Sequence, residues 1–287
     1  MYRRAVACDR MERHVASPTN ALVKSLVRLR DRRAREAEGA ALVEGAREVR
    51  RALEGGWRPR LLVTCAELFS PEAAAADGAW RAWPADRVAF SPAAFGKVSL
   101  RQHPDGVLGL FEPPRRTLID LPWPPAGLYL VADGLEKPGN LGALLRTADA
   151  AGADAVFVTG SGTDLLNPQV VRASMGSLFN VPTLAVEAGE LRRVLADRGV
   201  RSVVTGPAAD VDLWDVDLRG SVAIVVGTEH AGLADAWWEA ADDRVRVPMV
   251  GAADSLNVAT TGALLLFEAR RQRRARPGRA DAVRSSA

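Results

Sequence analysis

Short apolar segments alternate with amphipathic segments along the second half of the chain. Runs rich in Val, Leu and Ala predict strands, at 128–133, 155–160, 181–186, 201–206, 221–227 and 245–249. Between them, apolar residues recur at helical spacing and predict helices, at 141–152, 167–176, 189–199, 233–240 and 256–276. Apolar strands separated by amphipathic helices are typical of a parallel sheet covered on both faces. The second half therefore predicts an α/β domain built on a parallel sheet.

The first half carries the same kinds of pattern in a smaller unit. Leucines mark one face of a predicted helix over 20–37, whose remaining surface carries arginines. Further predicted strands lie at 41–46, 59–65, 88–91 and 106–112, and further helices at 48–56 and 92–99. A segment with five prolines then interrupts the pattern, and proline excludes a helix interior or a central strand. The predicted organisation is a basic tail (1–19), a small α/β domain (20–112), a linker (113–126), the parallel-sheet domain (127–275) and a disordered tail (276–287).

Composition narrows the class of protein. Apolar residues make up 48% of the chain, enough for a real core, and no apolar run reaches 18 residues, so no membrane span is expected. The first residues lack the apolar stretch of a signal peptide. Two cysteines, Cys8 and Cys65, cannot make a disulfide framework, and three scattered histidines suggest no metal site. A reducing cytoplasmic setting is the expectation.

The net charge of +3 is unevenly distributed. Residues 1–60 hold 15 Lys and Arg against 8 Asp and Glu, and residues 270–287 hold 7 against 1. The stretch between them is acidic, with 16 against 26. Basic ends on an acidic body suit a partner rich in phosphate, although solvated helix faces and a disordered tail give the same counts.

The stretch from Leu135 to Ala153 places one Asn and one Arg at a helix start. Asn140 stands where an N-cap belongs, and Arg146 lies beside the predicted core face of the helix. The structural interpretation is a capped helix with a surface Arg paired to Asp149. The spacing fits neither G-x-x-x-x-G-K-[ST] nor G-x-G-x-x-G, which excludes a mononucleotide phosphate loop and a nucleotide-dependent oxidoreductase of the Rossmann type.

Two further motifs follow predicted strands, where ligands of open α/β sheets bind. Glu229 comes directly after the strand that ends near Gly227, followed by His230. Its structural interpretation is a loop carboxylate favoured by the positive end of the next helix. Ser255 and Asn257 lie at the start of the last helix, where Ser255 would serve as N-cap and Asn257 as a polar residue of the first turn.

The order and combination of these motifs resemble the SpoU (TrmH) family of RNA 2′-O-ribose methyltransferases of the SPOUT class. The motifs are N-x-G-x-x-x-R-T-A, then G-T-E-x-x-G-L, then P-M-x(5)-S-L-N-V-A, and residues 169–182 resemble the signature between the first two. The resemblance extends to the front of the chain and covers most of residues 17–272. His230 stands where the family usually has Gly, which predicts an altered loop geometry and retained activity.

The resemblance implies a deep trefoil knot in the second domain and an L7Ae/L30e-like fold for the first. It implies S-adenosylmethionine as cofactor and a homodimer through the knot. The implied cofactor residues are Thr205, Gly206, Gly227, Thr228, Glu229, Val247, Pro248, Met249, Ser255, Leu256 and Asn257. The residues expected to bind RNA are Lys24, Arg28, Arg32, Arg35 and Arg172.

The resemblance also assigns roles in catalysis. Family proposals make the arginine that matches Arg146 a general base, but a guanidinium hardly deprotonates in proteins. We therefore expect Arg146 to grip an RNA phosphate and stabilise developing alkoxide charge. Asn140 and Asn257 would orient Arg146 and the ribose, Glu229 would hold Arg146 or Asn140, and Ser255 would brace the loop.

The expected substrate is large-subunit (23S) ribosomal RNA, because family members with this N-terminal extension often act on it. Length and Arg/Ala-rich composition resemble enzymes of the avilamycin-resistance kind, so antibiotic resistance is an expectation from resemblance alone. Two alternatives stay open: a tRNA 2′-O-methyltransferase, and an RNA-binding ribosome-assembly factor that keeps the fold without activity. DNA and membranes are not expected as partners.

Overall fold

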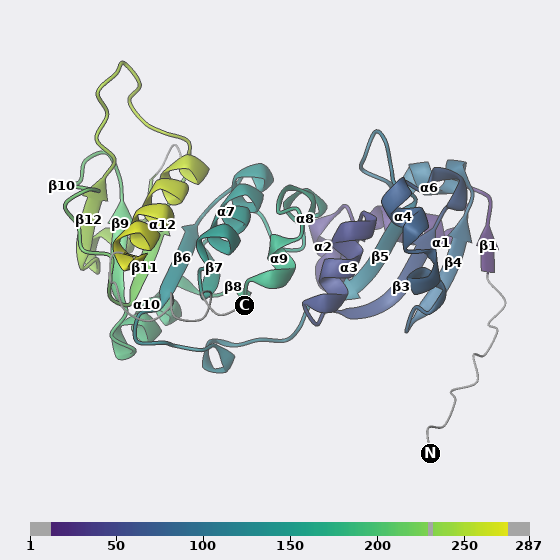
Figure 1. Cartoon of the computed structure of the whole chain (residues 1–287), viewed down its shortest axis with the longest axis horizontal. Helices are drawn as coiled ribbons and strands as arrows, with labels where there is room; N and C mark the ends of the chain where they lie inside the picture. The colour runs from purple at the N-terminus through teal and green to yellow at the C-terminus, as the bar shows by residue number, and fades with distance from the viewer. Residues whose placement is uncertain (1–12, 229–231, 275–287) are drawn as a thin grey trace, which may run out of the picture. The chain divides into compact units, whose positions relative to one another are not determined.

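The computed structural model describes residues 13–228 and 232–274, and the chain divides into two compact units between Pro114 and Arg115 (Figure 1). The predicted disordered tail at 276–287 and most of the predicted basic tail lie outside the described residues. Within the described ranges, no helix is both long and apolar enough to cross a membrane.

The first unit contains a mixed five-stranded sheet in the order β1-β4-β3-β5-β2. The strands pair parallel except where β5 meets β2 and β3. The strands are β1 (Arg13–Val15), β2 (Ala41–Glu44), β3 (Arg58–Thr64), β4 (Asp86–Phe90) and β5 (Val107–Glu112). The helices are α1 (Ala21–Arg28), α2 (Arg32–Glu38), α3 (Ala46–Glu54), α4 (Pro71–Ala75), α5 (Asp77–Arg81) and α6 (Pro92–Val98), with a 3-10 turn at Ala66–Leu68. Buried apolar residues of α1 and α6 pack with the strands to form one core, so the predicted small α/β domain is confirmed.

The single helix predicted over 20–37 is wrong, because the chain breaks between α1 and α2. The carboxylate of Asp31 accepts a hydrogen bond from the backbone N–H of Ala34 at 3.1 Å and so caps a new helix. The guanidinium of Arg35 then reaches back and donates to the carbonyls of Leu29 and Arg30, at 2.8 Å each. These polar contacts satisfy the backbone groups that the break leaves without helical partners.

The second unit contains an all-parallel seven-stranded sheet in the order β10-β12-β9-β11-β6-β7-β8. Its strands are β6 (Leu128–Asp133), β7 (Ala155–Thr159), β8 (Thr183–Ala185), β9 (Arg201–Thr205), β10 (Val211–Asp212), β11 (Val222–Val226) and β12 (Asp243–Arg246). Its helices are α7 (Pro138–Ala151), α8 (Pro168–Ala173), α9 (Ser177–Asn180), α10 (Ala188–Asp197), α11 (Asp235–Glu239) and α12 (Val258–Arg274), with a 3-10 turn at Leu118–Asp120. The predicted alternation of strands and helices and the parallel sheet are confirmed. The two-residue edge strand β10 was not predicted.

Both faces of this sheet are covered, as the apolar strands predict. Residues of α10 and α11 pack with alternate strand residues on one face, among them Tyr129 and Val131 of β6. Helices α7 and α12 pack against each other beside the sheet, in front of β6 and β11 in Figure 1. The proline-rich segment predicted as a linker lies on the α10 face, where Trp123 stacks on Phe157 with ring centroids 6.1 Å apart.

Two glycines allow close packing around α7. A Cβ on Gly142 would lie 2.3 Å from Cβ of Ala173 in α8 and 2.9 Å from the backbone nitrogen of Ser174. A Cβ on Gly262 of α12 would lie 2.4 Å from Cδ2 of Leu144 in α7. These gaps are shorter than real Cβ contacts, so α7 occupies its position because both residues lack a side chain.

Candidate functional site

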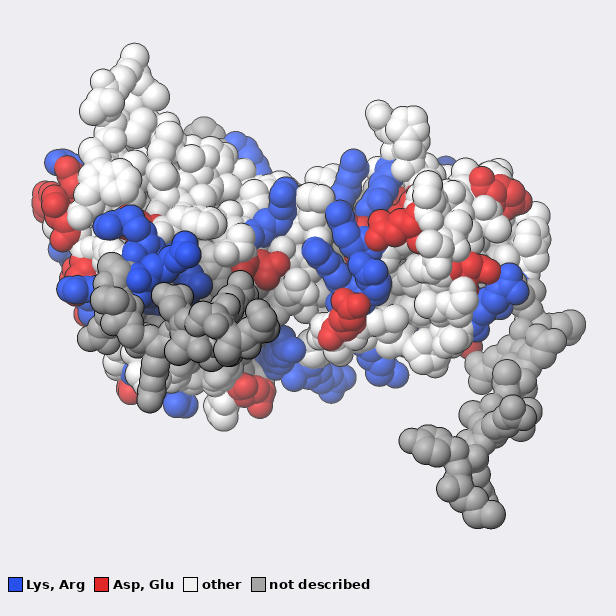
Figure 2. All heavy atoms as spheres, viewed as in Figure 1, with Lys and Arg blue, Asp and Glu red and all other residues white. Residues whose placement is uncertain are grey.

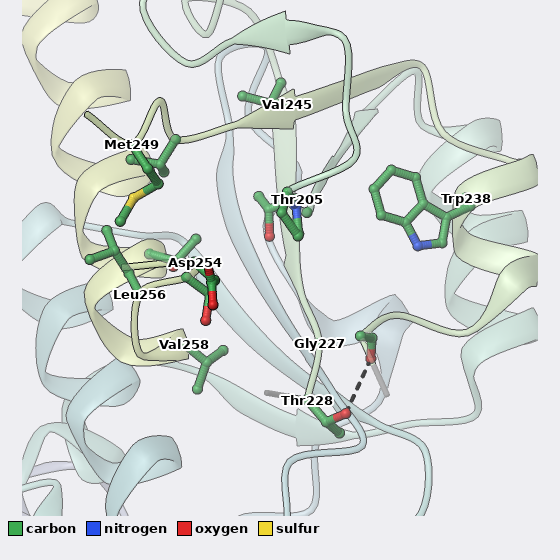
Figure 3. A pocket seen from close by; sticks show the side chains of 15 residues that line it. Thr205, Gly227, Thr228, Trp238, Val245, Met249, Asp254, Leu256 and Val258 are labelled. Atoms are coloured by element: carbon green, nitrogen blue, oxygen red, sulfur yellow. Dashed lines mark hydrogen bonds between the residues drawn. The ribbon is translucent and has the colours of Figure 1, made fainter. Parts of the chain in front are cut away.

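A pocket of about 340 Å³ opens at the carboxyl edge of the parallel sheet, where β9, β11 and β12 end (Figure 3). Open parallel sheets place ligands at this edge. The loops after these strands, helix α11 and the start of α12 form its walls. The lining residues are Thr205, Gly206, Pro207, Gly227, Thr228, Gly232, Trp238, Val245, Val247, Met249, Asp254, Ser255, Leu256, Val258 and Thr261.

Most of the residues predicted to bind a cofactor line this one pocket. They are Thr205, Gly206, Gly227, Thr228, Val247, Met249, Ser255 and Leu256. Pro248 and Asn257 are not among the lining residues. Glu229 and His230 lie outside the described residues. Segments more than 40 residues apart in the sequence therefore meet around one cavity, which is the arrangement that the motifs predicted.

The loop after β11 turns back sharply at its glycines. Thr228 and Gly232 exchange backbone hydrogen bonds of 3.0 and 3.1 Å, which closes the loop at its base. A Cβ on Gly227 would lie 2.4 Å from the carbonyl oxygen of Gly232, so only glycine fits there. Gly227, Thr228 and Gly232 all line the pocket, so this part of its wall carries little side-chain bulk.

Seven lining residues were not assigned from the sequence: Pro207, Gly232, Trp238, Val245, Asp254, Val258 and Thr261. Val258 and Thr261 are in the first turn of α12, close to the predicted motif. Trp238 belongs to an amphipathic helix whose pattern says only that one face is buried. Its place in the pocket depends on the tertiary packing of α11, for which the sequence carries no local signal.

The side chains of Asn140 and Asn257 are brought together across 117 residues of sequence. Nδ2 of Asn257 donates to Oδ1 of Asn140 at 3.2 Å, which joins the first turn of α7 to the start of α12. Oδ1 of Asn257 accepts the backbone N–H of Ala259 at 2.9 Å, so Asn257 acts as the N-cap of α12. This cap fixes which end of the Asn257 amide faces Asn140.

These contacts correct two capping assignments. Asn140 is not an N-cap, because α7 begins at Pro138 and the residue before it makes no side-chain cap. Proline is favoured at the first helical position, since its missing N–H would have no partner there. Ser255 does not occupy the cap position of α12 either, because Asn257 does.

Arg146 is exposed on α7, and it makes no hydrogen bond or ion pair within the described ranges. The alternative of a surface pair with Asp149 is wrong, since Asp149 instead accepts a hydrogen bond of 3.3 Å from Asn180 of α9. Arg146 follows Gly142 by four residues and so shares the helix side that packs on α8. It is not among the residues that line the pocket. The guanidinium of Arg146 is therefore open to solvent and lies outside the pocket.

The residues expected to bind RNA divide into exposed and buried ones. Lys24, Arg28, Arg32 and Arg172 are exposed, and Arg32 forms an ion pair of 2.8 Å with Glu36. Arg35 is only 2% exposed and serves the helix break described above, so its assignment to RNA binding is corrected. Figure 2 shows basic side chains gathered over α2 and α3 of the first unit, and over the end of α12 in the second.

Comparison with known proteins identifies the family. The model of the SpoU rRNA Methylase family matches residues 127–267, and that of the MRM3-like substrate binding domain matches residues 20–109. The chain is 32% identical over 255 residues to the 23S rRNA (uridine(2479)-2′-O)-methyltransferase of Streptomyces viridochromogenes, a match that covers 85% of this chain and 87% of that protein.

Two solved structures resemble most of the chain. One is the crystal structure of an RNA 2′-O ribose methyltransferase, 45% identical, with a TM-score of 0.79 over 91% of this chain and 99% of that one. The other is the SpoU methyltransferase AviRb from Streptomyces viridochromogenes in complex with AdoMet, 32% identical, with a TM-score of 0.83 over 91% and 100%. The chain therefore belongs to the SpoU family of RNA 2′-O-ribose methyltransferases.

Proposed function

We propose that this protein transfers a methyl group from S-adenosylmethionine to a ribose 2′-hydroxyl of 23S ribosomal RNA. The observation that carries the proposal is the pocket at the carboxyl edge of the sheet, which is lined by eight of the residues that the motifs predicted. Its size, about 340 Å³, falls in the range of pockets that hold cofactor-sized ligands. The similar AviRb structure was solved in complex with AdoMet.

The chemistry of the pocket fits this cofactor. Gly227, Thr228 and Gly232 line the pocket with little side-chain bulk, which suits recognition of a purine edge by backbone groups. Val247 and Leu256 provide apolar walls, and the carboxylate of Asp254 suits the positive charge of a sulfonium and an ammonium group. When bound, the cofactor supplies an electrophilic methyl group.

The protein has to orient the ribose and stabilise the charge that develops on its 2′-oxygen. In the proposal, Arg146 holds an RNA phosphate with its planar guanidinium and lowers the energy of the developing alkoxide. Asn257, fixed by its cap on α12, holds the Asn140 amide in one orientation beside the ribose. Ser255 braces the pocket loop, and Glu229 would hold Arg146 or Asn140 in place. Most of the rate acceleration would then come from positioning and electrostatics.

Several finer features of the family belong to the same proposal. They are the trefoil knot of the second unit, a homodimer formed through it, and an L7Ae/L30e-like mode of RNA binding by the first unit. The match of residues 20–109 to a substrate binding domain supports the last of these. The activity named for the Streptomyces viridochromogenes relative, methylation of 23S rRNA, favours that substrate over tRNA. Resistance to an antibiotic would follow if the modified nucleotide lies in the drug's binding site.

Methyl transfer to defined RNAs tests the proposed function. Purified protein with methyl-labelled S-adenosylmethionine is expected to label 23S rRNA and to leave tRNA unlabelled, and mapping should place the label on one ribose 2′-oxygen. Labelling of tRNA alone would make the protein a tRNA methyltransferase. Tight RNA binding with no cofactor binding and no label would support the assembly-factor alternative.

Replacing either of two arginines of the first unit is expected to change a different property, RNA binding for Arg28 and stability for Arg35. Arg28→Ala should weaken RNA binding and lower the slope of log affinity against log salt by about 1, because one exposed phosphate contact is lost. Arg35→Ala should instead lower the free energy of unfolding by about 2 kcal/mol, because the carbonyls of Leu29 and Arg30 lose a charged donor. Filter binding at several salt concentrations and chemical denaturation measure the two effects. If the salt dependence of RNA binding is unchanged in Arg28→Ala, Arg28 on α1 does not contact an RNA phosphate.

A further inference from the structure

Trp238 is the aromatic side chain of the cofactor pocket. It comes from α11 and lies across from the end of β9, near Thr205 (Figure 3). A Cβ on Gly206 would lie 2.6 Å from Cζ2 and 2.8 Å from Cη2 of Trp238. The indole therefore lies directly against the backbone of Gly206, and it keeps this position because Gly206 has no side chain.

The neighbouring tryptophan shows that this placement is specific. Trp237 is 1% exposed, belongs to the core between α10 and the sheet, and lies under the guanidinium of Arg192 at 5.3 Å. Trp238 is part-exposed and lines the pocket instead. Successive residues of a helix point about 100° apart. Within one turn of α11, the indole of Trp237 therefore points into the core and the indole of Trp238 points into the pocket.

The other walls of the pocket lack flat rings. Every other described lining residue is aliphatic, small or polar, so Trp238 provides the one flat aromatic surface among them. In the view of Figure 3, Asp254 and Trp238 lie on opposite sides of Thr205. A carboxylate on one side and an indole on the other suit a ligand with a cationic part and an aromatic part.

We propose that the adenine ring of the cofactor packs against the indole of Trp238, which makes this residue a determinant of affinity for the nucleoside half. The inference rests on the proposed function, because it takes S-adenosylmethionine as the ligand. Adenine is the cofactor's single aromatic group, and aromatic pairs gain from offset or edge contacts beyond the area they bury. On this wall of the pocket, the purine would be recognised by ring packing against the indole and not by side-chain hydrogen bonds.

Calorimetric titration with S-adenosylhomocysteine and with adenosine tests the assignment. Trp238→Ala is expected to lose about tenfold in affinity for both ligands, because both contain the adenine ring. Trp238→Phe keeps a flat ring and should stay within about threefold of the unchanged protein. Circular dichroism checks that each variant is folded, and Trp238→Phe remains informative if the alanine variant is not.

Tryptophan emission gives a second readout. The change in emission on adding adenosine should vanish in Trp238→Phe and persist in Trp214→Phe, whose side chain is 55% exposed. A loss of affinity for S-adenosylhomocysteine without a loss for adenosine would place the indole against the amino-acid half and overturn the proposal. Unchanged affinities for both ligands in Trp238→Ala would also overturn it. If the unchanged protein binds S-adenosylhomocysteine at no concentration, the proposed function itself fails.

Discussion

Arg146→Ala is expected to slow methyl transfer to RNA by at least about 100-fold while leaving the affinity for S-adenosylhomocysteine unchanged. Removing one preorganised donor from a developing oxyanion costs about 10²–10³ in rate in other enzymes. Cofactor affinity should hold because Arg146 is not among the residues that line the pocket. Stability should hold as well, since the side chain is exposed and the described part of the chain offers it no ion pair or hydrogen bond.

Two variants make this result interpretable. Arg146→Lys keeps the charge and loses the planar fork, so it should recover part of the rate and not all of it. Arg193→Ala removes another exposed arginine of the second unit, whose Nε donates a 3.2 Å hydrogen bond to the carbonyl of Gly189, and this variant should transfer methyl groups normally. Single-turnover rates and calorimetry separate chemistry from binding. A near-normal rate for Arg146→Ala would refute the phosphate-anchor role.

Gly142→Ala is expected to lower the free energy of unfolding by about 2 kcal/mol, although alanine is the better helix former by about 1 kcal/mol. The added methyl would lie 2.3 Å from Cβ of Ala173 and 2.8 Å from its backbone carbonyl carbon. Backbone cannot move aside as a flexible side chain does, so α7 and α8 must separate. Because α7 carries both Asn140 and Arg146, this displacement should also slow methyl transfer.

Gly139→Ala is the matched control in the same helix. A Cβ at Gly139 meets nothing within 4 Å, so the substitution should raise the free energy of unfolding by up to about 1 kcal/mol. Urea denaturation of both variants gives the comparison. Equal stabilities for the two variants would mean that the α7–α8 contact is softer than the distances indicate.

The strands of the second unit were predictable because their signal is local. Strands β6 and β11 are buried along their whole length, and their residues are apolar except for Asp133 at the end of β6. The helix over 20–37 was not predicted correctly, because Asp31 and Arg35 are both acceptable inside a helix. In the structure, both side chains form hydrogen bonds with backbone groups at the break between α1 and α2. These bonds replace helical hydrogen bonds of the backbone, and the spacing of apolar residues carries no information about them.

The site was predictable where glycine and short polar residues follow strands, and less so elsewhere. Neighbouring atoms lie so close to Gly206 and Gly227 that a side chain would not fit at either position. A glycine in the sequence after a strand therefore indicates a closely packed loop. Trp238 reaches the pocket through the packing of α11, which amphipathic spacing does not define. Ser255 and Asn257 are both good caps, and the choice between them follows from where α12 begins, with Val258 buried at 6% exposure.

The strand order of the second unit also fixes when its site can exist during protein synthesis. Leu128 of β6 pairs with Val222 of β11, so the centre of the sheet cannot close until the ribosome has passed that strand. The pocket then needs Leu256 and Val258, which are made later still. Contacts so distant in sequence make folding slow and leave apolar strands exposed in the growing chain. A nascent chain therefore has no cofactor pocket until the start of α12 has emerged, and the apolar strands made before then are the part of the chain most prone to aggregation.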